Sequence, residues 1–297
     1  MVGTRRSGAF GILAAIVGFG AGLCAAGGAW AQTTTPSPPV IGQPEPWQMG
    51  FPPPYTPLMD KVESLNDLLF VIITLICAFV LALLIYVMWR FHASRHPVAT
   101  SVTHNTLLEV AWTVLPILIL VVIAIPSFRL LYYGDKAVDA AFTIKVVGHQ
   151  WYWEYDYPDQ GNFTVESRIL PEADRLKLKP TNPRMLAVDQ EMVIPANTTI
   201  RIIGTGADTM HGWTVWGFGI KKTVIPGRLN EGWINVREEG LYFGQCSQIC
   251  GNGHAYMPIA VNVVSKAAFD AWVAEKKKSA GLAPTSDVAS AAVPANR

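Results

Sequence analysis

Residues 68–87 form a run of 20 residues that contains no charged side chain. In a helix, which rises about 1.5 Å per residue, this run spans about 30 Å, the thickness of the hydrocarbon core of a bilayer. A second apolar run covers residues 110–128 and contains Pro116 and Pro126, which membrane helices tolerate where neighbours satisfy the freed carbonyls. The two runs predict a transmembrane helical hairpin over residues 65–133.

The loop between the two runs carries an excess of positive charge. It holds Arg90, Arg95 and three histidines, and excess Lys and Arg on a short loop marks the cytoplasmic side of a membrane. Both flanks of the hairpin are therefore expected in the periplasm, with the chain in a bacterial inner membrane. The composition agrees, because 51% of the residues are hydrophobic and 15% charged. The net charge of +1 comes without a long basic run, so nucleic-acid binding is not expected.

The N-terminus has the three parts of a secretory signal peptide. Arg5 and Arg6 precede an apolar stretch over residues 10–26, and the Ala-Trp-Ala that follows fits a small-x-small cleavage site. We therefore expect a signal peptide over residues 1–31, cleaved before Gln32. A periplasmic segment over residues 32–64 follows, and its Pro-rich part is expected to be extended. The alternative is a first transmembrane helix, which the short, Gly- and Ala-rich apolar core disfavours.

Residues 134–278 change to short β-rich segments broken by Gly, Pro and Asn, which is typical of an antiparallel sandwich or barrel. Apolar Ile200 and Ile202 alternate with Arg201, as in a strand with one buried face. This region is therefore predicted to be an exported β domain. The candidate strands are residues 142–147, 151–155, 198–205, 232–236, 241–245 and 259–264.

A closing helix is expected at the end of this domain. Ser265 can cap it, and Phe269 and Val273 fall at helical spacing, so that they can pack on the sandwich. The remaining tail, residues 279–297, is rich in Ala, Ser and Pro without a periodic apolar face. We expect it to be disordered.

One short segment of the exported domain combines four side chains of metal-ligand type. Cys246, Cys250, His254 and Met257 follow one another at spacings of four, four and three residues, and His211 lies upstream beside another strand end. Soft thiolates and a thioether combined with imidazoles select copper, and a cupredoxin sandwich supplies one upstream histidine to such a loop. If both thiolates bridge, the set can serve two copper ions that share one electron, which suits electron transfer.

Three other sites would use some of these side chains. A periplasmic disulfide between Cys246 and Cys250 leaves the histidines and Met257 without a role. A tetrahedral zinc site has the right number of Cys and His ligands, but zinc has little use for a thioether. A mononuclear blue copper site normally uses one cysteine. The residues alone leave these alternatives open.

Four motifs together resemble those of cytochrome c oxidase subunit II in bacteria. With the hairpin, the resemblance covers about residues 60–275. It implies an α+β membrane protein, in which a two-helix transmembrane hairpin precedes an all-β, cupredoxin-like sandwich. It also implies an oxidase subunit that accepts electrons from cytochrome c at a dinuclear copper (CuA) centre and passes them to haem in subunit I, where oxygen is reduced to water with proton translocation. The motifs are residues 246–257 (CSQICGNGHAYM), 148–153 (GHQWYW), 211–215 (HGWTV) and 225–230 (IPGRLN).

The resemblance also implies how the ligands are shared. In the family, one copper ion is held by the residues that match His211 and, weakly, Met257. The other is held by the match to His254 and by the main-chain carbonyl of the residue at Gln248. The two cysteines, Cys246 and Cys250 in this chain, bridge both ions.

Four further residues receive roles from the resemblance. Trp151 resembles the exposed tryptophan at which electrons arrive from cytochrome c, whereas its predicted strand alone favours a core aromatic. Glu109, at the cytoplasmic end of the second helix, matches the carboxylate at the start of a proton path into subunit I, and the alternative is an interfacial residue. Asp189 and Asp208 match carboxylates that dock a basic cytochrome c.

The chain departs from the family at the second copper ligand. Gln248 stands where a glutamate that helps to bind magnesium at the contact with subunit I is most frequent, and a neutral amide is a far weaker ligand for a hard cation. Magnesium binding is therefore left open. The expected partners are cytochrome c, oxidase subunits I and III, and membrane lipid.

Other functions fit the sequence less well. A quinol oxidase subunit II has a similar fold but lacks the copper ligands. A copper-delivery or sensing protein needs neither the hairpin nor Trp151 and Glu109. A nitrous oxide reductase would need a large second copper domain, for which 297 residues leave no room.

Overall fold

The computed structural model describes residues 39–98, 101–137 and 139–281. The predicted signal peptide, residues 1–31, lies outside these ranges, as does most of the tail that is predicted to be disordered. Residues 39–56, which include much of the Pro-rich stretch, run without a helix and touch the β domain through a bridge between Val40 and Leu241.

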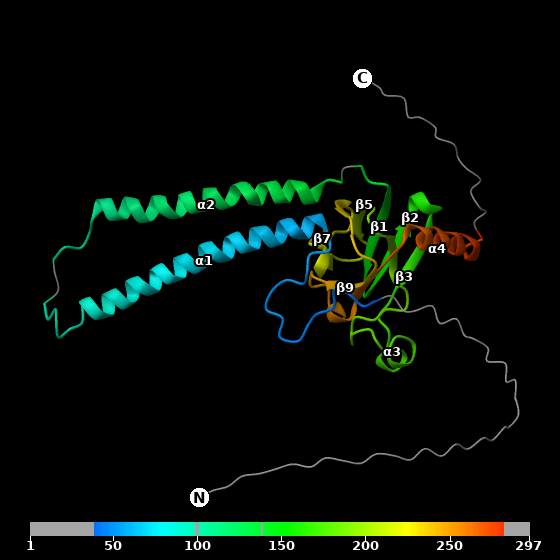
Figure 1. Ribbon diagram of the computed structural model, residues 1–297, viewed down its shortest axis with the longest axis horizontal. Coiled ribbons are helices and arrows are strands. Elements are labelled where there is room, and N and C mark those ends of the chain that lie inside the picture. Colours follow the sequence, from blue (N-terminus) through cyan, green and yellow to red (C-terminus); the bar gives the residue numbers. More distant parts are fainter. Residues whose placement is uncertain (1–38, 99–100, 138, 282–297) are drawn as a thin grey trace, which may run out of the picture. The chain divides into compact units, whose positions relative to one another are not determined.

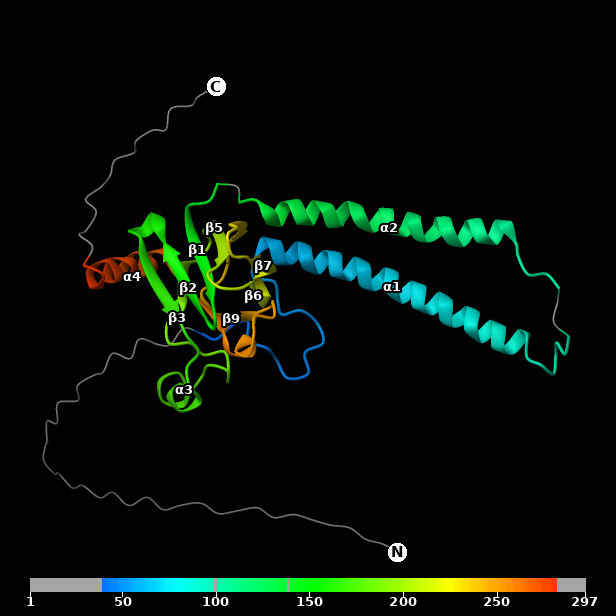
Figure 2. The ribbon, with the colours of Figure 1, turned by 180° about the vertical axis from the view of Figure 1, so that it is seen from behind.

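Two long helices precede the β domain, α1 (Pro57–Arg90) and α2 (Thr106–Asp135), and they run side by side (Figures 1 and 2). Both are long and apolar enough to cross a membrane, and the most apolar stretch of each helix is not buried inside the protein. Pro116 and Pro126 lie inside α2. The two predicted transmembrane helices are confirmed.

Each of these helices begins at a residue that caps its first turn. The Thr56 hydroxyl accepts a hydrogen bond from the Met59 N–H (3.0 Å) and donates one to the main-chain oxygen of Phe218 (2.7 Å). The Asn105 side chain accepts one from the Leu108 N–H (3.2 Å). Such caps each contribute about 1 kcal/mol, and the bond to Phe218 also attaches the start of α1 to the β domain.

The exported domain is a sandwich of two five-stranded sheets, with strand orders β3-β2-β1-β5-β8 and β4-β10-β9-β6-β7. Neighbouring strands are antiparallel except for the pairs β1/β5 and β4/β10, which are parallel. This is the predicted cupredoxin-like sandwich. The strands are β1 (Phe142–His149), β2 (Tyr152–Tyr157), β3 (Phe163–Ser167), β4 (Met192–Pro195), β5 (Ile200–Gly206), β6 (His211–Val215), β7 (Ile220–Val224), β8 (Asn230–Ile234), β9 (Gly240–Cys246) and β10 (Pro258–Val264).

The structure confirms the six candidate strands, apart from shifts at their ends, and adds four that the sequence did not predict: β3, β4, β6 and β7. One shift matters for the site. The pairing of His149 with Tyr152 closes a two-residue hairpin turn, so Trp151 lies in that turn and not in the predicted strand. It is 37% exposed, whereas a core aromatic at this position would be buried.

The core fills the space between the sheets. Trp153, Tyr155 and Tyr157 alternate along β2 and are fully buried, as the two-residue period of a strand dictates. The Tyr157 hydroxyl donates to the main-chain oxygen of Val193 and accepts from its N–H, both at 3.0 Å. Since Val193 lies in β4 of the opposite sheet, one side chain joins the two sheets.

Two short helices complete the domain. α4 (Lys266–Ser279) begins at the predicted cap, Ser265, whose side chain accepts from the Ala268 N–H (3.2 Å), and it buries Phe269 against Phe142 of β1. The closing helix is therefore confirmed. α3 (Glu172–Leu178) lies in the loop between β3 and β4 and was not predicted.

Three contacts attach the ends of the hairpin to the sandwich. The Trp233 indole of β8 donates to the main-chain oxygen of Tyr133 in α2 (2.8 Å). The Lys222 ammonium contacts Asp135 (2.6 Å), and Arg237 binds Asp60 of α1 through its guanidinium. The start of α1 and the end of α2 are thus the ends next to the exported domain.

Candidate metal centre

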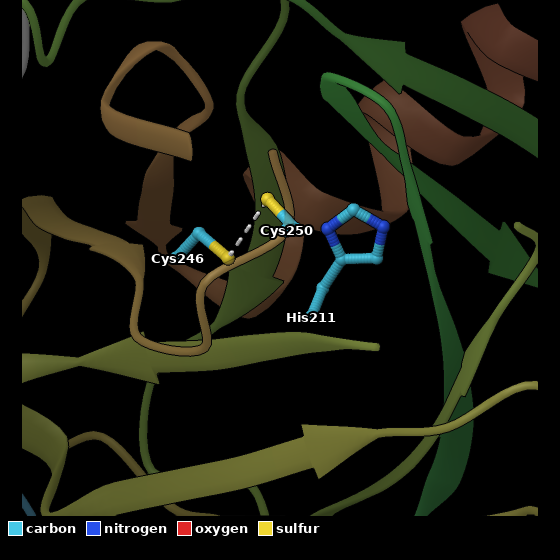
Figure 3. Close-up of side chains that lie close together, drawn as sticks. All are labelled: His211, Cys246 and Cys250. Carbon is cyan, nitrogen blue, oxygen red and sulfur yellow. Dashed lines mark hydrogen bonds between the residues drawn. The ribbon is translucent and has the colours of Figure 1, made fainter. Parts of the chain in front are cut away.

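The ligand-type side chains meet because β6 and β9 are neighbours in one sheet. Trp213 in β6 is opposite Cys246, the last residue of β9, and the Ser247 N–H continues the pairing to the Gly212 carbonyl (2.9 Å). His211, the first residue of β6, therefore lies beside the loop that follows β9. Figure 3 shows its imidazole facing Cys246 and Cys250.

Three side chains form the centre of the site. The ligand atoms of His211, Cys246 and Cys250 all lie within 4.8 Å of one another, and all three residues are buried. The two sulfurs are 3.9 Å apart, well beyond the length of about 2.05 Å of a disulfide bond. Both cysteines are free thiols.

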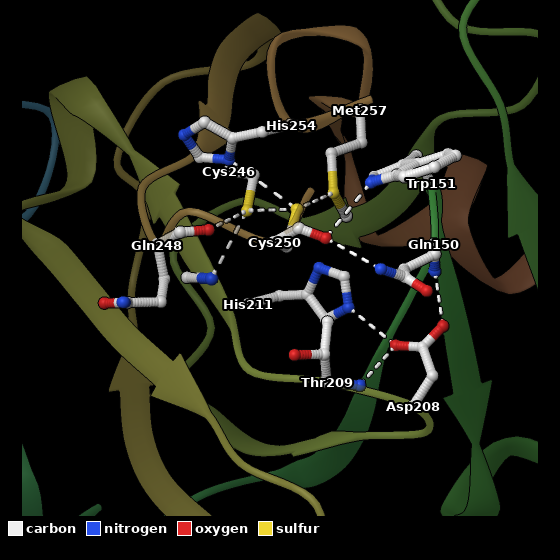
Figure 4. Close-up of polar contacts among 11 residues, drawn as sticks. Gln150, Trp151, Asp208, Thr209, His211, Cys246, Gln248, Cys250, His254 and Met257 are labelled. Carbon is white, nitrogen blue, oxygen red and sulfur yellow. Dashed lines mark hydrogen bonds and ion pairs between the residues drawn. The ribbon is translucent and has the colours of Figure 1, made fainter. Parts of the chain in front are cut away.

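Three more groups surround this centre (Figure 4). The main-chain oxygen of Gln248 lies 3.2 Å from Cys246 Sγ. His254 Nδ1 lies 3.6 Å and Met257 Sδ 3.5 Å from Cys250 Sγ. All six groups named from the sequence as copper ligands are thus gathered at one end of the sandwich.

The His211 imidazole has one nitrogen engaged and one nitrogen bare. Its Nε2 lies 2.9 Å from Asp208 Oδ1, so an N–H there donates to the carboxylate. Its Nδ1 is buried and has no hydrogen-bond partner. A buried nitrogen with a lone pair and no partner is costly unless something occupies its coordination position, and a carboxylate on the other ring nitrogen is the usual companion of a metal-bound histidine.

The two thiols differ in acidity. Burial alone would raise the pKa of Cys246, but interaction with His211 and the hydrogen bond from the Gly212 N–H (3.5 Å) lower it below the ordinary thiol value. Burial and the nearby Cys246 raise the pKa of Cys250. One thiolate is therefore favoured before a metal arrives, and a bound cation would supply the charge that ionises the other.

The donor set fits soft metal ions better than hard ones. Two thiolates, two imidazoles and a thioether are ligands that copper prefers, whereas oxygen ligands dominate at magnesium or calcium sites. Met257 is 1% exposed with its sulfur turned toward Cys250, so the thioether belongs to the site. The residues present therefore fit copper.

The hairpin turn between β1 and β2 packs on the ligand loop. The Trp151 indole N–H donates to the main-chain oxygen of Cys250 (3.3 Å), and the Gln150 amide donates to the same oxygen (2.8 Å). Trp153 donates to the main-chain oxygen of Met257 (3.1 Å). The sequence did not point to Gln150, because only the folded chain brings this turn beside a loop that is 100 residues away.

The two carboxylates expected to dock a partner both hold main-chain groups. Asp208 accepts from the N–H groups of Gln150 and Thr209 (both 2.6 Å) as well as from His211, and although burial opposes it, these bonds lower its pKa. Asp189 accepts from two main-chain N–H groups at 2.7 Å. The role of Asp208 as the residue that orients His211 was missed, although its place three residues before a candidate ligand could have suggested it.

Glu109 is not near the metal centre. It lies in the first turn of α2, at the end of the helix away from the exported domain, and it is half-buried. The structure thus separates Glu109 from the ligand set by the length of the membrane helix.

Comparisons with known proteins agree over both parts of the chain. The family described as cytochrome c oxidase subunit II, periplasmic domain, matches residues 142–264, and the corresponding transmembrane domain matches residues 44–130. A probable cytochrome c oxidase subunit 2 of Rickettsia bellii is 46% identical over 247 residues, which cover 83% of this chain and 91% of the relative. Cytochrome c oxidase subunit 2 of Cereibacter sphaeroides is 42% identical over 272 residues, with coverage of 86% and 89%.

One similar solved structure is the periplasmic domain of subunit II of the cytochrome oxidase of Bradyrhizobium japonicum. It is 44% identical to this chain and covers 48% of this chain and 99% of its own length, with a TM-score of 0.45.

Proposed function

The chain belongs to the cytochrome c oxidase subunit II family, and from this premise we propose that it accepts electrons from cytochrome c at a dinuclear copper centre. As a subunit of a haem-copper oxidase, it would pass these electrons to haem in subunit I. Oxygen would be reduced to water there, with coupled proton translocation. The observation that carries the proposal is a pair of free, buried thiols 3.9 Å apart beside a buried imidazole nitrogen without a partner.

The proposed ligands divide between two copper ions. Cys246 and Cys250 would bridge both ions, His211 and Met257 would complete one, and His254 and the main-chain oxygen of Gln248 the other. The lone Nδ1 of His211 and the inward Met257 sulfur support this division. Together these residues would hold two copper ions, which would supply one-electron transfer with little rearrangement of the site.

The protein would hold this ligand set in place before and after each transfer. Asp208 fixes the tautomer and orientation of His211 through the hydrogen bond to Nε2. Pairing of β6 with β9 fixes His211 relative to Cys246. Cys250 and Met257 are nearly inaccessible to water, so solvent would rearrange little around the centre.

We infer that electrons arrive at Trp151. Its side chain is partly exposed in the turn that covers the ligand loop, and its N–H contacts the carbonyl of Cys250. A partly exposed aromatic ring that is hydrogen-bonded to a ligand residue is suited to contact a partner. Asp189 and Asp208 are proposed to help to dock the basic cytochrome. Their carboxylates would attract its positive charge in addition to accepting the hydrogen bonds that they already make.

The placement of the remaining parts follows from the same proposal. The hairpin, residues 65–133, would lie in the bacterial inner membrane beside subunits I and III, with residues 32–64 and the copper domain, residues 134–278, in the periplasm. Glu109 would lie at the cytoplasmic start of a proton path. Gln248 offers a carbonyl to copper, while its amide is a weak ligand for magnesium.

The experiment that tests this function compares two tryptophan variants of the assembled oxidase. Trp151→Ala should keep its copper but be reduced more slowly by cytochrome c in stopped-flow measurements. Trp47→Ala is the matched control, because Trp47 is 97% exposed in the segment before α1, outside the proposed site. Equal reduction rates for the Trp151 variant and the wild type would refute the role of Trp151, and absence of copper from the wild type would refute the function.

A further inference from the structure

A groove of about 460 Å³ lies between α1 and α2 at the ends next to the exported domain. Each helix lines it with four residues at positions i, i+3, i+4 and i+7, from Lys61 to Leu68 in α1 and from Pro126 to Tyr133 in α2. This spacing places the four residues of each helix on one face. The groove is therefore built by two helix faces that confront each other.

Two cations line the groove without a carboxylate partner. Lys61 and Arg129 form no salt bridge with any residue in the described part of the chain, and the Lys61 ammonium lies 4.8 Å from the centre of the Tyr133 ring. The only hydroxyl on the α1 face, that of Ser64, already donates to the main-chain oxygen of Asp60 (2.8 Å). The charge of the lining is therefore positive, with both cations open to a ligand.

The acidic residues near these helix ends do not neutralise the groove. Asp60 and Asp135 are engaged by cations of the exported domain. Glu63 and Asp67 lie about 200° and 240° around α1 from Lys61 at 100° per residue, so they belong to another face of the helix. The helices thus separate their basic and acidic side chains, with the basic ones on the groove.

The groove lies at the position along each helix where the uncharged run ends. Arg129 directly follows the uncharged residues 110–128, and Leu68 is the first residue of the uncharged run in α1. Lipid phosphates lie just outside the hydrocarbon core, so the cations are at phosphate depth. Leu65, Leu68 and Pro126 provide an apolar wall toward the hydrocarbon.

We propose that this groove binds an anionic phospholipid of the outer leaflet, with its phosphate between Lys61 and Arg129 and an acyl chain along the apolar wall. Charge-assisted hydrogen bonds from two cations hold a phosphate strongly. A helix of another subunit would bury both charges without partners, which is costly. A free phosphate ion would leave the apolar half of the groove uncovered. The site is independent of the copper centre.

Photo-crosslinking in membranes that contain the assembled oxidase tests the proposal. A phosphatidylglycerol with a photoactivatable acyl chain should label peptides that contain Leu68 or Pro126, and the phosphatidylcholine analogue should label them much less. Each cation near a lipid surface contributes about 1 kcal/mol, so Lys61→Gln and Arg129→Gln should each lower the labelling affinity about fivefold, and the double variant about 30-fold.

Two control variants separate the groove from general charge and folding effects. Lys136→Gln/Lys221→Gln removes two exposed lysines, one directly after α2 and one beside Lys222 in β7, and should leave labelling unchanged. Lys61→Arg/Arg129→Lys keeps both charges and should retain it. Unchanged labelling in the double Gln variant, equal labelling by phosphatidylcholine, or displacement of the lipid by inorganic phosphate would each overturn the proposal.

Discussion

Replacing Gly253 with alanine would place a methyl group inside the volume that the Trp151 indole now occupies. A Cβ at this position would lie 2.2 Å from Cδ2 and 2.4 Å from Cγ of the ring. Ordinary contacts begin near 3.4 Å, so the ring would have to move by about 1.2 Å. The backbone does not require glycine, because Gly253 has φ −89° and ψ 10°, in the bridge region that other residues also occupy.

The expected result is an intact copper centre that receives electrons more slowly. The hydrogen bond from the Trp151 indole to the carbonyl of Cys250 is already 3.3 Å long, and a displacement of about 1.2 Å away from the loop would break it. Misplacement of a reacting group by about 1 Å can lower a rate by about 100-fold, so we expect a decrease of about 10- to 100-fold. The local overpacking should destabilise the loop by about 1–3 kcal/mol.

Stopped-flow reduction by cytochrome c measures this effect, with copper content determined on the same samples. Gly50→Ala is the matched control, because a Cβ at Gly50 would meet nothing within 4 Å. If Gly253→Ala kept both its copper and the wild-type reduction rate, the packing of Trp151 on the ligand loop would not govern electron transfer, and the reasoning would be wrong.

Three further changes test other parts of the structure. Asp208→Asn should weaken copper binding by about 10- to 100-fold, since it alters the partner of the ligand imidazole, and competition with a copper chelator measures this. Tyr157→Phe leaves both main-chain groups of Val193 unpaired in the core and should destabilise the exported domain by about 1–3 kcal/mol, with an unchanged melting temperature as the contrary result. The hydrogen bond from Arg237 lowers the pKa of Asp60, so this pair stabilises the fold above the unfolded pKa of about 3.9 and stops doing so as the pH falls through the lowered value. Because both side chains are more than 40% exposed, Asp60→Asn should cost less than about 1 kcal/mol near neutral pH and nothing in strong acid, and a constant difference across this range would contradict the assignment.

The helices were predictable because a long uncharged run has few other structures open to it. β5 was predictable from the alternation of its residues, because Ile200 and Ile202 are buried and Arg201 between them is partly exposed. β4 gave no such signal, because all four of its residues are buried and a strand covered on both faces shows no alternation. β7 places two lysines between its buried ends, and this polar centre hid a strand at the edge of its sheet.

The residue pattern indicated five of the six groups that the structure gathers, because four of them lie in one segment of the chain, and the family resemblance added the main-chain oxygen of Gln248. The groups that hold the ligands were harder to find. Asp208 reaches His211 across a short loop, and Gln150 and Trp151 come from a hairpin turn about 100 residues before Cys250. Contacts between distant segments depend on strand order and register, which local patterns do not contain.

Copper counting combined with electron paramagnetic resonance tests the central claim most directly. We expect two copper ions per chain and one unpaired electron distributed over both. In Cys250→Ser, loss of one bridge should abolish that shared-electron signal. A single copper with the electron on one ion, bound zinc in place of copper, or a shared-electron signal that survives Cys250→Ser would contradict the account.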